Sequence, residues 1–193
     1  MDNTKMIYPI VAFGHPLLRK KSVDISPDYP ELDLIIENMY QSMYVSKGVG
    51  LAAPQIGLNI RLFLLDTSPY ANIYPEVKIF KKAFINPTIE EDTGNEWVFE
   101  EGCLSIPNIH EDVVRKDTVR IAYYDENFNK HIEVFDGIVA RIIQHEYDHL
   151  EGVLFVDRIS NLRKMLLKRR LNDIANGNIS PSYKMKFAPK KRK

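Results

Sequence analysis

The chain has 193 residues, of which 45% are hydrophobic, and it contains 26 basic and 26 acidic side chains. This length and apolar content suffice for one well-packed domain and exclude two domains of ordinary size. No apolar run reaches the roughly 18 residues of a membrane span, and the first residues lack the layout of a secretory signal. A lone cysteine cannot form an internal disulfide. We therefore expect a reducing, cytoplasmic setting.

The neutral total hides an uneven distribution of charge along the chain. Residues 161–193 contain eleven Lys and Arg and one acid, whereas residues 1–160 contain fifteen bases and twenty-five acids. A basic end of this kind is typical of segments that contact polyanions such as RNA, although it equally fits a solubilising end. We therefore expect a folded body over residues 1–177 and a basic, poorly ordered tail over residues 178–193.

The first third of the chain predicts one extended segment and one helix. Residues 7–13 are extended up to the turn signal Gly14-His15-Pro16, and no ligand pattern surrounds His15, so we expect it to be structural. Prolines at positions 27 and 30 precede apolar residues spaced three and four apart, which predict a helix to about Val45.

The middle of the chain predicts short strands, and the last third predicts helices. Asp136 is the expected N-cap of one helix. Residues 161–175 form a basic amphipathic helix, with Leu162, Met165 and Leu166 against the body and Leu171 as a further candidate contact. The strands are expected at 60–66, 77–85, 96–99, 113–124 and 131–135, with a loop at 68–75 and a hairpin turn at 125–129.

Residues 144–152, QHEYDHLEG, carry the strongest chemical signal. On a helix, His145 and His149 lie four apart and point two imidazoles at one cation from the same face. Glu146 lies about 100° further round, where its carboxylate can take a proton from a metal-bound water. The bare pattern also occurs as a solvated polar stripe on surface helices.

Apolar residues around this pattern indicate an interior helix rather than a surface one. Ile138 and Ile142 lie on the histidine side of the helical wheel, while Ile143 and Leu150 lie opposite. Buried histidines and a buried glutamate need partners, which a metal supplies. The fold is therefore expected to be α+β, with short, mostly antiparallel strands around a central metal-binding helix and with a C-terminal helix.

Two imidazoles leave the third ligand to be found. Phe155 stands where one protease class has a third histidine, no glutamate follows Glu151, and Asp157 and Asp173 are weak downstream options. The only cysteine, Cys103, lies in the glycine-flanked stretch EGCLS and is the better candidate. A thiolate with two imidazoles leaves a fourth position open, which is the catalytic arrangement. Two further histidines, His110 and His131, lack ligand spacing and are expected to be surface or structural.

Residues 48–57, GVGLAAPQIG, contain three glycines and two alanines, which suggest backbone that another group approaches closely. Gln55 supplies the amide donors there and is a candidate to stabilise an oxyanion, while residues 48–50 line a groove. A tight connecting loop is the alternative interpretation. The stretch lacks the lysine and the Ser/Thr of a phosphate-binding loop.

In their order along the chain, GVGLAAPQ (48–55), EGCLS (101–105) and QHEYDHLEG (144–152) closely resemble the three signature motifs of the peptide deformylases, and the likeness extends from about residue 7 to residue 155. The resemblance implies a hydrolase in residues 1–177 that removes the formyl group from the N-terminal formyl-methionine of new bacterial proteins and releases formate. It implies Cys103, His145 and His149 as metal ligands, Glu146 as acid and base, and Gln55 with the Leu104 backbone N–H as oxyanion donors.

Ferrous iron is the physiological ion that the resemblance implies, while ligand type alone also suits Zn²⁺, Ni²⁺ or Co²⁺. Val49 and Gly50 are expected to offer an open strand edge to an extended substrate peptide, and Ile142 to floor the methionine pocket. The loop at 68–75 and the basic tail vary in such families, so they bear on substrate preference and on contact with the ribosome or its RNA.

Two rival functions differ in class from this one. The helix motif alone suggests a general zinc endopeptidase, which Phe155 and the missing downstream glutamate disfavour. The basic tail suggests a ribosome- or RNA-binding protein whose metal site is purely structural.

Overall fold

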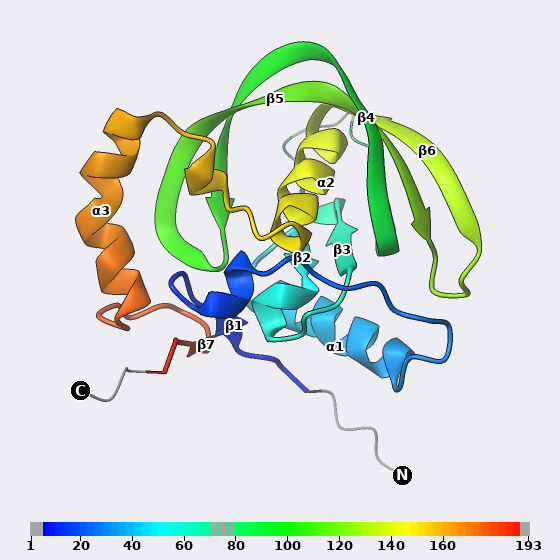
Figure 1. Ribbon diagram of the computed structural model, residues 1–193, viewed down its shortest axis with the longest axis horizontal. Helices are drawn as coiled ribbons and strands as arrows, with labels where there is room; N and C mark the ends of the chain where they lie inside the picture. Colours follow the sequence, from blue (N-terminus) through cyan, green and yellow to red (C-terminus); the bar gives the residue numbers. More distant parts are fainter. Residues whose placement is uncertain (1–5, 71–72, 74–76, 78, 190–193) are drawn as a thin grey trace.

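Helix α2 (Gly137–Leu150) lies at the centre of the molecule, beneath a strongly bent antiparallel sheet (Figure 1). The computed structural model describes residues 6–70, 73, 77 and 79–189. The strand order in the sheet is β2-β3-β4-β5-β6. These strands are β2 (Gly50–Ala52), β3 (Leu62–Asp66), β4 (Lys81–Cys103), β5 (Ile106–Tyr124) and β6 (Lys130–Asp136).

The remaining elements surround this arrangement. Helix α1 (Leu32–Val45) and helix α3 (Asn161–Ala175) lie on different sides of α2, and a small parallel sheet joins β1 (Ile10–Val11) to β7 (Met185–Lys186) near both chain ends (Figure 1). Short 3-10 turns cover Pro16–Arg19, Ala53–Ile56, Ser68–Tyr70 and Phe155–Asp157. The α+β prediction with a central helix and mostly antiparallel strands is confirmed.

Strands β4 and β5 are much longer than expected and form one arched hairpin. The sequence suggested separate pieces at 77–85, 96–99 and 113–124, because the exposed polar residues between them interrupt the alternation. Register shifts between Ile85 and Thr88 and between Thr93 and Glu96 keep β4 paired with β5 through that stretch. Such irregularities bend a strand, and here the bend carries the sheet over α2 (Figure 1).

The helix boundaries follow the local chemistry. Helix α1 begins at Leu32 rather than at the prolines, because the intervening Glu31 has a left-handed backbone conformation, with φ of 55°, which cannot continue a right-handed helix. Asp136 occupies the predicted N-cap position of α2, but its side chain makes no capping hydrogen bond. His15 is structural as predicted, because its Nδ1 accepts a hydrogen bond from the Leu17 N–H at 3.2 Å.

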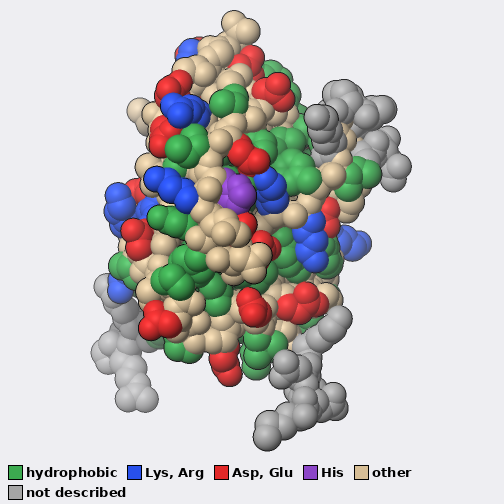
Figure 2. Space-filling model, turned by 90° about the vertical axis from the view of Figure 1, so that its right-hand side faces the viewer, with side chains coloured by type: hydrophobic (Ala, Val, Ile, Leu, Met, Phe, Trp, Pro, Cys, Tyr) green, Lys and Arg blue, Asp and Glu red, His purple; other side chains and the backbone are tan. Residues whose placement is uncertain are grey.

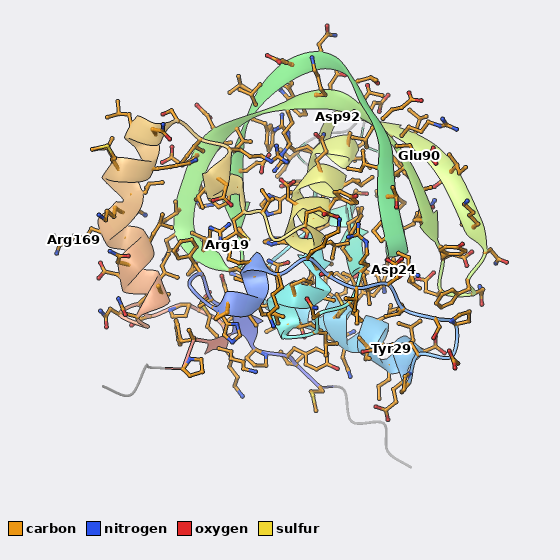
Figure 3. All side chains as sticks on the ribbon, in the orientation of Figure 1. Arg19, Asp24, Tyr29, Glu90, Asp92 and Arg169 are labelled. Atoms are coloured by element: carbon orange, nitrogen blue, oxygen red, sulfur yellow. The ribbon has the colours of Figure 1, made fainter. Side chains whose placement is uncertain are left out.

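Helix α3 packs through a different face from the one predicted. Leu162, Met165 and Leu166 are 66%, 72% and 63% exposed, so the expected contacts of these three residues with the body are wrong. The further candidate Leu171 is buried as predicted, and it packs with Leu167 and Ile174 instead of those three residues. Their cluster also contains Ile109, Val113 and Phe155. Arg169 lies on the outer side of α3 (Figure 3).

Residues 178–189, hereafter the C-terminal segment, return to the body instead of forming the poorly ordered tail that we expected. Strand β7 pairs with β1 in the register Ile10 to Met185, and the Ile10 N–H donates to the Lys184 carbonyl at 2.9 Å. Ile179, Met185 and Phe187 pack against the cluster beneath α3. Residues 190–193 of the predicted tail, and most of residues 71–78 in the predicted loop and strand start, lie outside the described residues.

On the face that carries β6, acidic and basic side chains are interspersed among hydrophobic ones (Figure 2). In the described part of the chain, every helix is too short or too polar to cross a membrane.

Candidate metal centre

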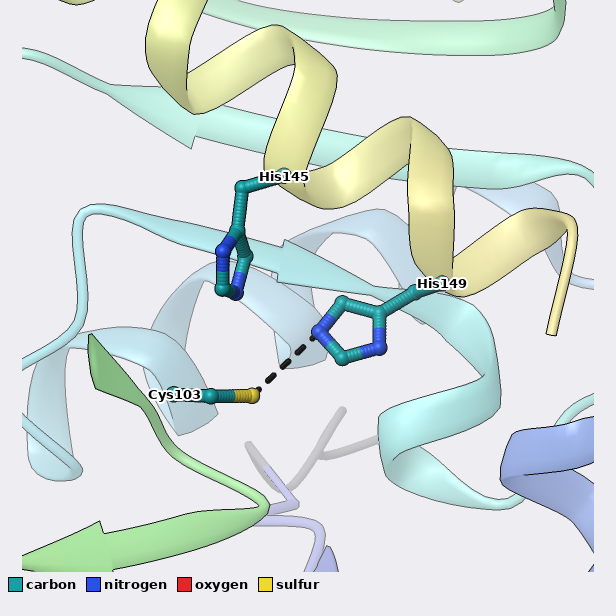
Figure 4. A group of neighbouring side chains, drawn as sticks. All are labelled: Cys103, His145 and His149. Carbon is teal, nitrogen blue, oxygen red and sulfur yellow. Dashed lines mark hydrogen bonds between the residues drawn. The ribbon is translucent and has the colours of Figure 1, made fainter. Parts of the chain in front are cut away.

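Cys103, His145 and His149 come together at the end of β4 and along one face of α2 (Figure 4). Their possible ligand atoms all lie within 4.8 Å of one another. The Cys103 Sγ is 3.3 Å from the His149 Nε2, and the two imidazole rings lie 5.2 Å apart at 77° to each other. The helical spacing therefore presents both rings to the sulfur.

The donor set fits a divalent transition-metal ion. A tetrahedral ion with a sulfur bond of about 2.3 Å and a nitrogen bond of about 2.1 Å holds those two ligand atoms roughly 3.6 Å apart. The observed sulfur-to-nitrogen distance of 3.3 Å is close to that value. Sulfur and imidazole nitrogen are ligands for zinc, iron, cobalt or nickel rather than for calcium or magnesium.

A buried carboxylate orients the first histidine. The Glu101 Oε2 lies 2.9 Å from the His145 Nδ1, which leaves the Nε2 of that ring for the cation. Arg115 donates to both Glu101 oxygens, at 2.7 and 2.9 Å, and Arg141 donates a further bond at 3.0 Å. Burial alone would raise the pKa of Glu101, but the hydrogen bonds from Arg115 and His145 outweigh it and hold that pKa well below its usual range.

Arg115 also ties this carboxylate to the last turn of α2. Arg115 donates to the Asp148 Oδ2 at 2.7 Å, and Arg158 donates to the same oxygen at 2.6 Å. Glu101 and Asp148 stand inside the sequence motifs, but our sequence reasoning gave them no role. Arg115, far from any motif, carried no signal. Spatial proximity alone reveals that these residues support the ligands.

Glu146 lies beside the ligands with its carboxylate against the backbone of β2. A Cβ added to Gly50 would lie 2.5 Å from the Glu146 Oε1, so only glycine leaves room for the acid in this position. The side chain is 5% exposed, and its Oε2 has no hydrogen-bond partner among the described residues. Burial raises the pKa of Glu146 to about 7.

Gln55 is held so that its amide group faces the sulfur. Its Oε1 accepts a hydrogen bond from the Ala52 N–H at 2.8 Å, which turns the Nε2 toward the Cys103 Sγ at 3.5 Å and the Ser105 Oγ at 3.4 Å. Leu104 lies between those two residues, in the turn that joins β4 to β5. The amide donor and the turn therefore face the same space.

That space is a cavity of about 870 Å³, open to the surface. Every residue that the sequence placed in the site lines this cavity, except His149, which is buried. Val49 and Gly50 lie on one wall, and β2 is the terminal strand of the five-stranded sheet. The remaining walls of the cavity come from α2, from the residues around the β4–β5 turn and from residues 180–183.

The other acids and histidines that the sequence left open are placed outside the ligand cluster. Asp157 is paired with Arg19, and His131 contacts the Asp125 carboxylate at 2.8 Å. His110 is exposed and packs against Gly102 at the cavity wall. Among the described residues, the one group suited to hold a metal ion contains Cys103 as its third ligand.

Comparison with known proteins gives the same result at the level of the whole chain. Residues 7–165 match the family described as polypeptide deformylase. The peptide deformylase of Flavobacterium johnsoniae is 53% identical in an alignment 194 residues long, and this alignment covers 97% of this chain and 99% of that protein. The enzyme of the same name from Christiangramia forsetii is 50% identical over the same shares of both chains.

Solved structures agree with these sequences. The crystal structure of peptide deformylase from Thermotoga maritima aligns with a TM-score of 0.72 at 39% identity and covers 80% of this chain and 99% of its own. The Plasmodium falciparum peptide deformylase aligns with a TM-score of 0.78 at 35% identity, over 87% of this chain and 95% of its own. This chain therefore belongs to the polypeptide deformylase family and is an enzyme that removes the N-formyl group from nascent peptides.

Proposed function

We propose that Cys103, His145 and His149 hold the catalytic cation and that Glu146 moves the proton in the hydrolysis of the formyl amide. The observation that carries this proposal is the cluster of three ligand atoms within 4.8 Å, beside the buried Glu146 Oε2, which has no hydrogen-bond partner in the described part of the chain. When bound, a divalent cation supplies Lewis acidity, which makes water a usable nucleophile near neutral pH. We assign ferrous iron as the physiological ion, and zinc, nickel or cobalt as ions that the same donors accept.

Glu146 acts as base and then as acid. Its raised pKa suits a group that must both accept and return a proton near neutral pH. The carboxylate takes the proton of the attacking water and then delivers it to the departing amine nitrogen. Formate and a free N-terminus are the products.

The oxyanion that forms at the formyl carbon needs donors aimed at it. The Gln55 Nε2 and the Leu104 backbone N–H fill this role, because both border the space in front of the Cys103 sulfur. Losing one such donor typically costs about 2.7–4 kcal/mol of barrier. Their separate supports, one in the 3-10 turn and one in the β4–β5 turn, hold them in place before the substrate arrives.

The substrate peptide pairs in extended form with the edge formed by Val49 and Gly50. Among the described residues, strand β2 pairs with β3 along one edge only. Its other edge is therefore available to a peptide backbone. Ile142 lines the cavity one turn before the ligand pair and floors the pocket for the methionine side chain. A narrow site for the formyl group rejects acetyl through its extra methyl, worth about 1–3 kcal/mol.

The chemistry is assigned to the metal site and its cavity, and contact with the ribosome or its RNA in the bacterial cytoplasm is assigned to the basic region over residues 161–193. Lys168 and Arg169 are exposed on α3 and available for phosphate contacts. Reversing both charges to glutamate should weaken co-sedimentation with ribosomes at low salt and leave formate release in solution unchanged. Undiminished co-sedimentation would reject the docking assignment.

A substrate panel tests the central proposal. We expect formate release from formyl-Met peptides, a much slower reaction with acetyl-Met peptides and no cleavage of internal peptide bonds. Glu146→Gln keeps the shape of the side chain and removes its basicity, so turnover should fall by about 10²–10⁴-fold while the bound metal stays at the unaltered level. A Glu146→Gln enzyme of normal activity would reject the acid and base assignment, and cleavage of internal bonds would favour the endopeptidase.

A further inference from the structure

The C-terminal segment reaches the catalytic cavity although it lies outside all three sequence motifs. Ser180, Pro181, Ser182 and Tyr183 line the cavity on the side of the β4–β5 turn. The segment is held there from both ends. The Asn178 N–H donates to the Asp173 carbonyl at 2.8 Å at the end of α3, and the Ala12 N–H donates to the Lys186 carbonyl at 2.9 Å beside β1.

Tyr183 makes the most specific contact of this segment. Its hydroxyl donates a hydrogen bond of 2.7 Å to the carbonyl of Leu104, and its ring packs against the core cluster of α1 and β3. The next carbonyl along the turn, that of Ser105, accepts a bond of 2.8 Å from the Phe13 N–H. Donors from the two chain ends therefore hold two consecutive carbonyls of the turn.

Leu104 presents one of the two oxyanion donors proposed above, and its N–H and its carbonyl belong to a single residue. When Cys103 is bound to the cation, the chain is fixed on the N-terminal side of Leu104. The hydrogen bond from Tyr183 fixes it on the C-terminal side. With both flanking groups fixed, the Leu104 N–H has little freedom to rotate away from the reacting carbonyl, which is the preorganisation that oxyanion stabilisation requires.

We propose that Tyr183 is a positioning residue for the deformylation reaction, which holds the Leu104 backbone in its donating orientation and makes the C-terminal segment part of the active site. This inference rests on the proposed role of Leu104. The other donor, Gln55, is held independently, because its Oε1 is bound by the Ala52 N–H within its own turn. Tyr183 therefore acts on one donor of the pair.

Tyr183→Phe tests the proposal, because it removes the hydroxyl and retains the ring that packs in the core. A neutral hydrogen bond contributes about 0.5–1.5 kcal/mol, so kcat for a formyl-Met peptide should fall by about 2- to 10-fold. The fall should appear in kcat and not in KM, because the oxyanion exists only in the transition state. The metal content per chain should match that of the unaltered enzyme.

Tyr123→Phe is the matched control. Its hydroxyl is also hydrogen-bonded, accepting from the Lys82 Nζ at 2.7 Å, but it lies near the far end of β5 and does not line the cavity. This variant should unfold at a lower temperature and keep its kcat at 25 °C. A general loss of stability thus lowers Tm without changing kcat, whereas loss of the Tyr183 bond changes kcat in fully folded protein.

An unchanged kcat in folded Tyr183→Phe overturns the proposal, as does a loss of activity that follows metal content or resides in KM alone. These outcomes leave the proposed function intact, since the unaltered enzyme still releases formate. Absence of formate release by the unaltered, metal-loaded enzyme would instead reject the proposed function itself.

Discussion

Single glycines and carboxylates decide the geometry of this site. Gly50 and Glu146 are the clearest pair, because the acid occupies the volume that a side chain at position 50 would take. Gly50→Ala should therefore displace the carboxylate without unfolding the chain, since the nearest clash is with the flexible end of Glu146. A displacement of about 1 Å at a catalytic group can cost about 10²-fold.

We expect Gly50→Ala to lower kcat by about 10- to 100-fold with the same metal content and a similar melting temperature. Formate release, metal analysis and thermal unfolding on one preparation measure all three. Normal turnover in this variant would mean that the position of the Glu146 carboxylate against β2 has no bearing on the reaction.

Glu101 lies behind the candidate ligand His145, and its carboxylate contacts the Nδ1 of that ring. Glu101→Gln retains the shape of the side chain but weakens the support of the His145 ring and leaves Arg115 with one of its two carboxylate partners, Asp148. The affinity for the cation should fall by about 10- to 100-fold, measured by competition with a chelator.

Glu111→Gln is the matched control for this variant. Glu111 is equally buried and also accepts two hydrogen bonds from one arginine, Arg163, at 2.7 Å each, but it does not contact the ligands. The Glu111→Gln variant should lose stability and keep its affinity for the cation. Equal losses of affinity in both variants would show that Glu101 supports the fold and not the ligand.

Glu133 gives a pH dependence whose direction follows from its partners. Burial raises its pKa, but hydrogen bonds from Lys82 and Tyr123 outweigh this and hold the pKa below its usual range. A carboxyl group with a lowered folded-state pKa stabilises the protein above its ordinary pKa of about 4.3. That contribution is lost as the pH falls through the folded-state value.

Glu133→Gln should therefore be less stable than the unaltered chain at pH 7, and the difference should shrink as the pH falls below about 4.3. Because Glu133 is distant in the fold from the metal ligands, the effects of metal loss in acid cancel between the two proteins. Urea unfolding at a series of pH values measures the difference. A gap that widens in acid would contradict the assigned direction of the shift.

At the level of elements, helix α3 carries two apolar stripes, and adjacent residues distinguish them. Leu167 is 5% exposed and Leu166 is 63% exposed. Leu167→Ala should lower the free energy of unfolding by about 2–4 kcal/mol because it leaves a cavity in the core, while Leu166→Ala should stay within about 0.5 kcal/mol. Denaturant unfolding compares the two, and equal costs would mean that α3 does not pack as described.

These elements show where sequence reasoning succeeds and where it stops. The four-residue spacing of His145 and His149 fixes their common face, because helix geometry is local. The predicted packing face of α3 was wrong, because both apolar stripes satisfy the same helical periodicity. Only contacts with the rest of the fold determine which stripe is buried. The length of β4 was underestimated, because its exposed middle lacks the alternation that marks a half-buried strand.

At the scale of the whole molecule, three distant stretches converge because the β4–β5 arch returns Cys103 to the face of α2. The motifs identified the ligands, but nothing in the sequence indicated Arg115 as their support or brought Tyr183 to the β4–β5 turn. Both contacts depend on long-range closure of the chain. The pairing of β7 with β1, which places Tyr183, joins residues about 175 positions apart.

Convergence on one cation is the central claim, and metal binding by Cys103→Ala tests it most directly. The variant protein and the unaltered protein are purified without oxygen and titrated with Fe²⁺ against a chelator of known affinity. We predict one tightly bound ion per unaltered chain, and loss of that tight binding together with loss of formate release in Cys103→Ala. Tight stoichiometric binding in the variant, or full activity without metal, would contradict the account.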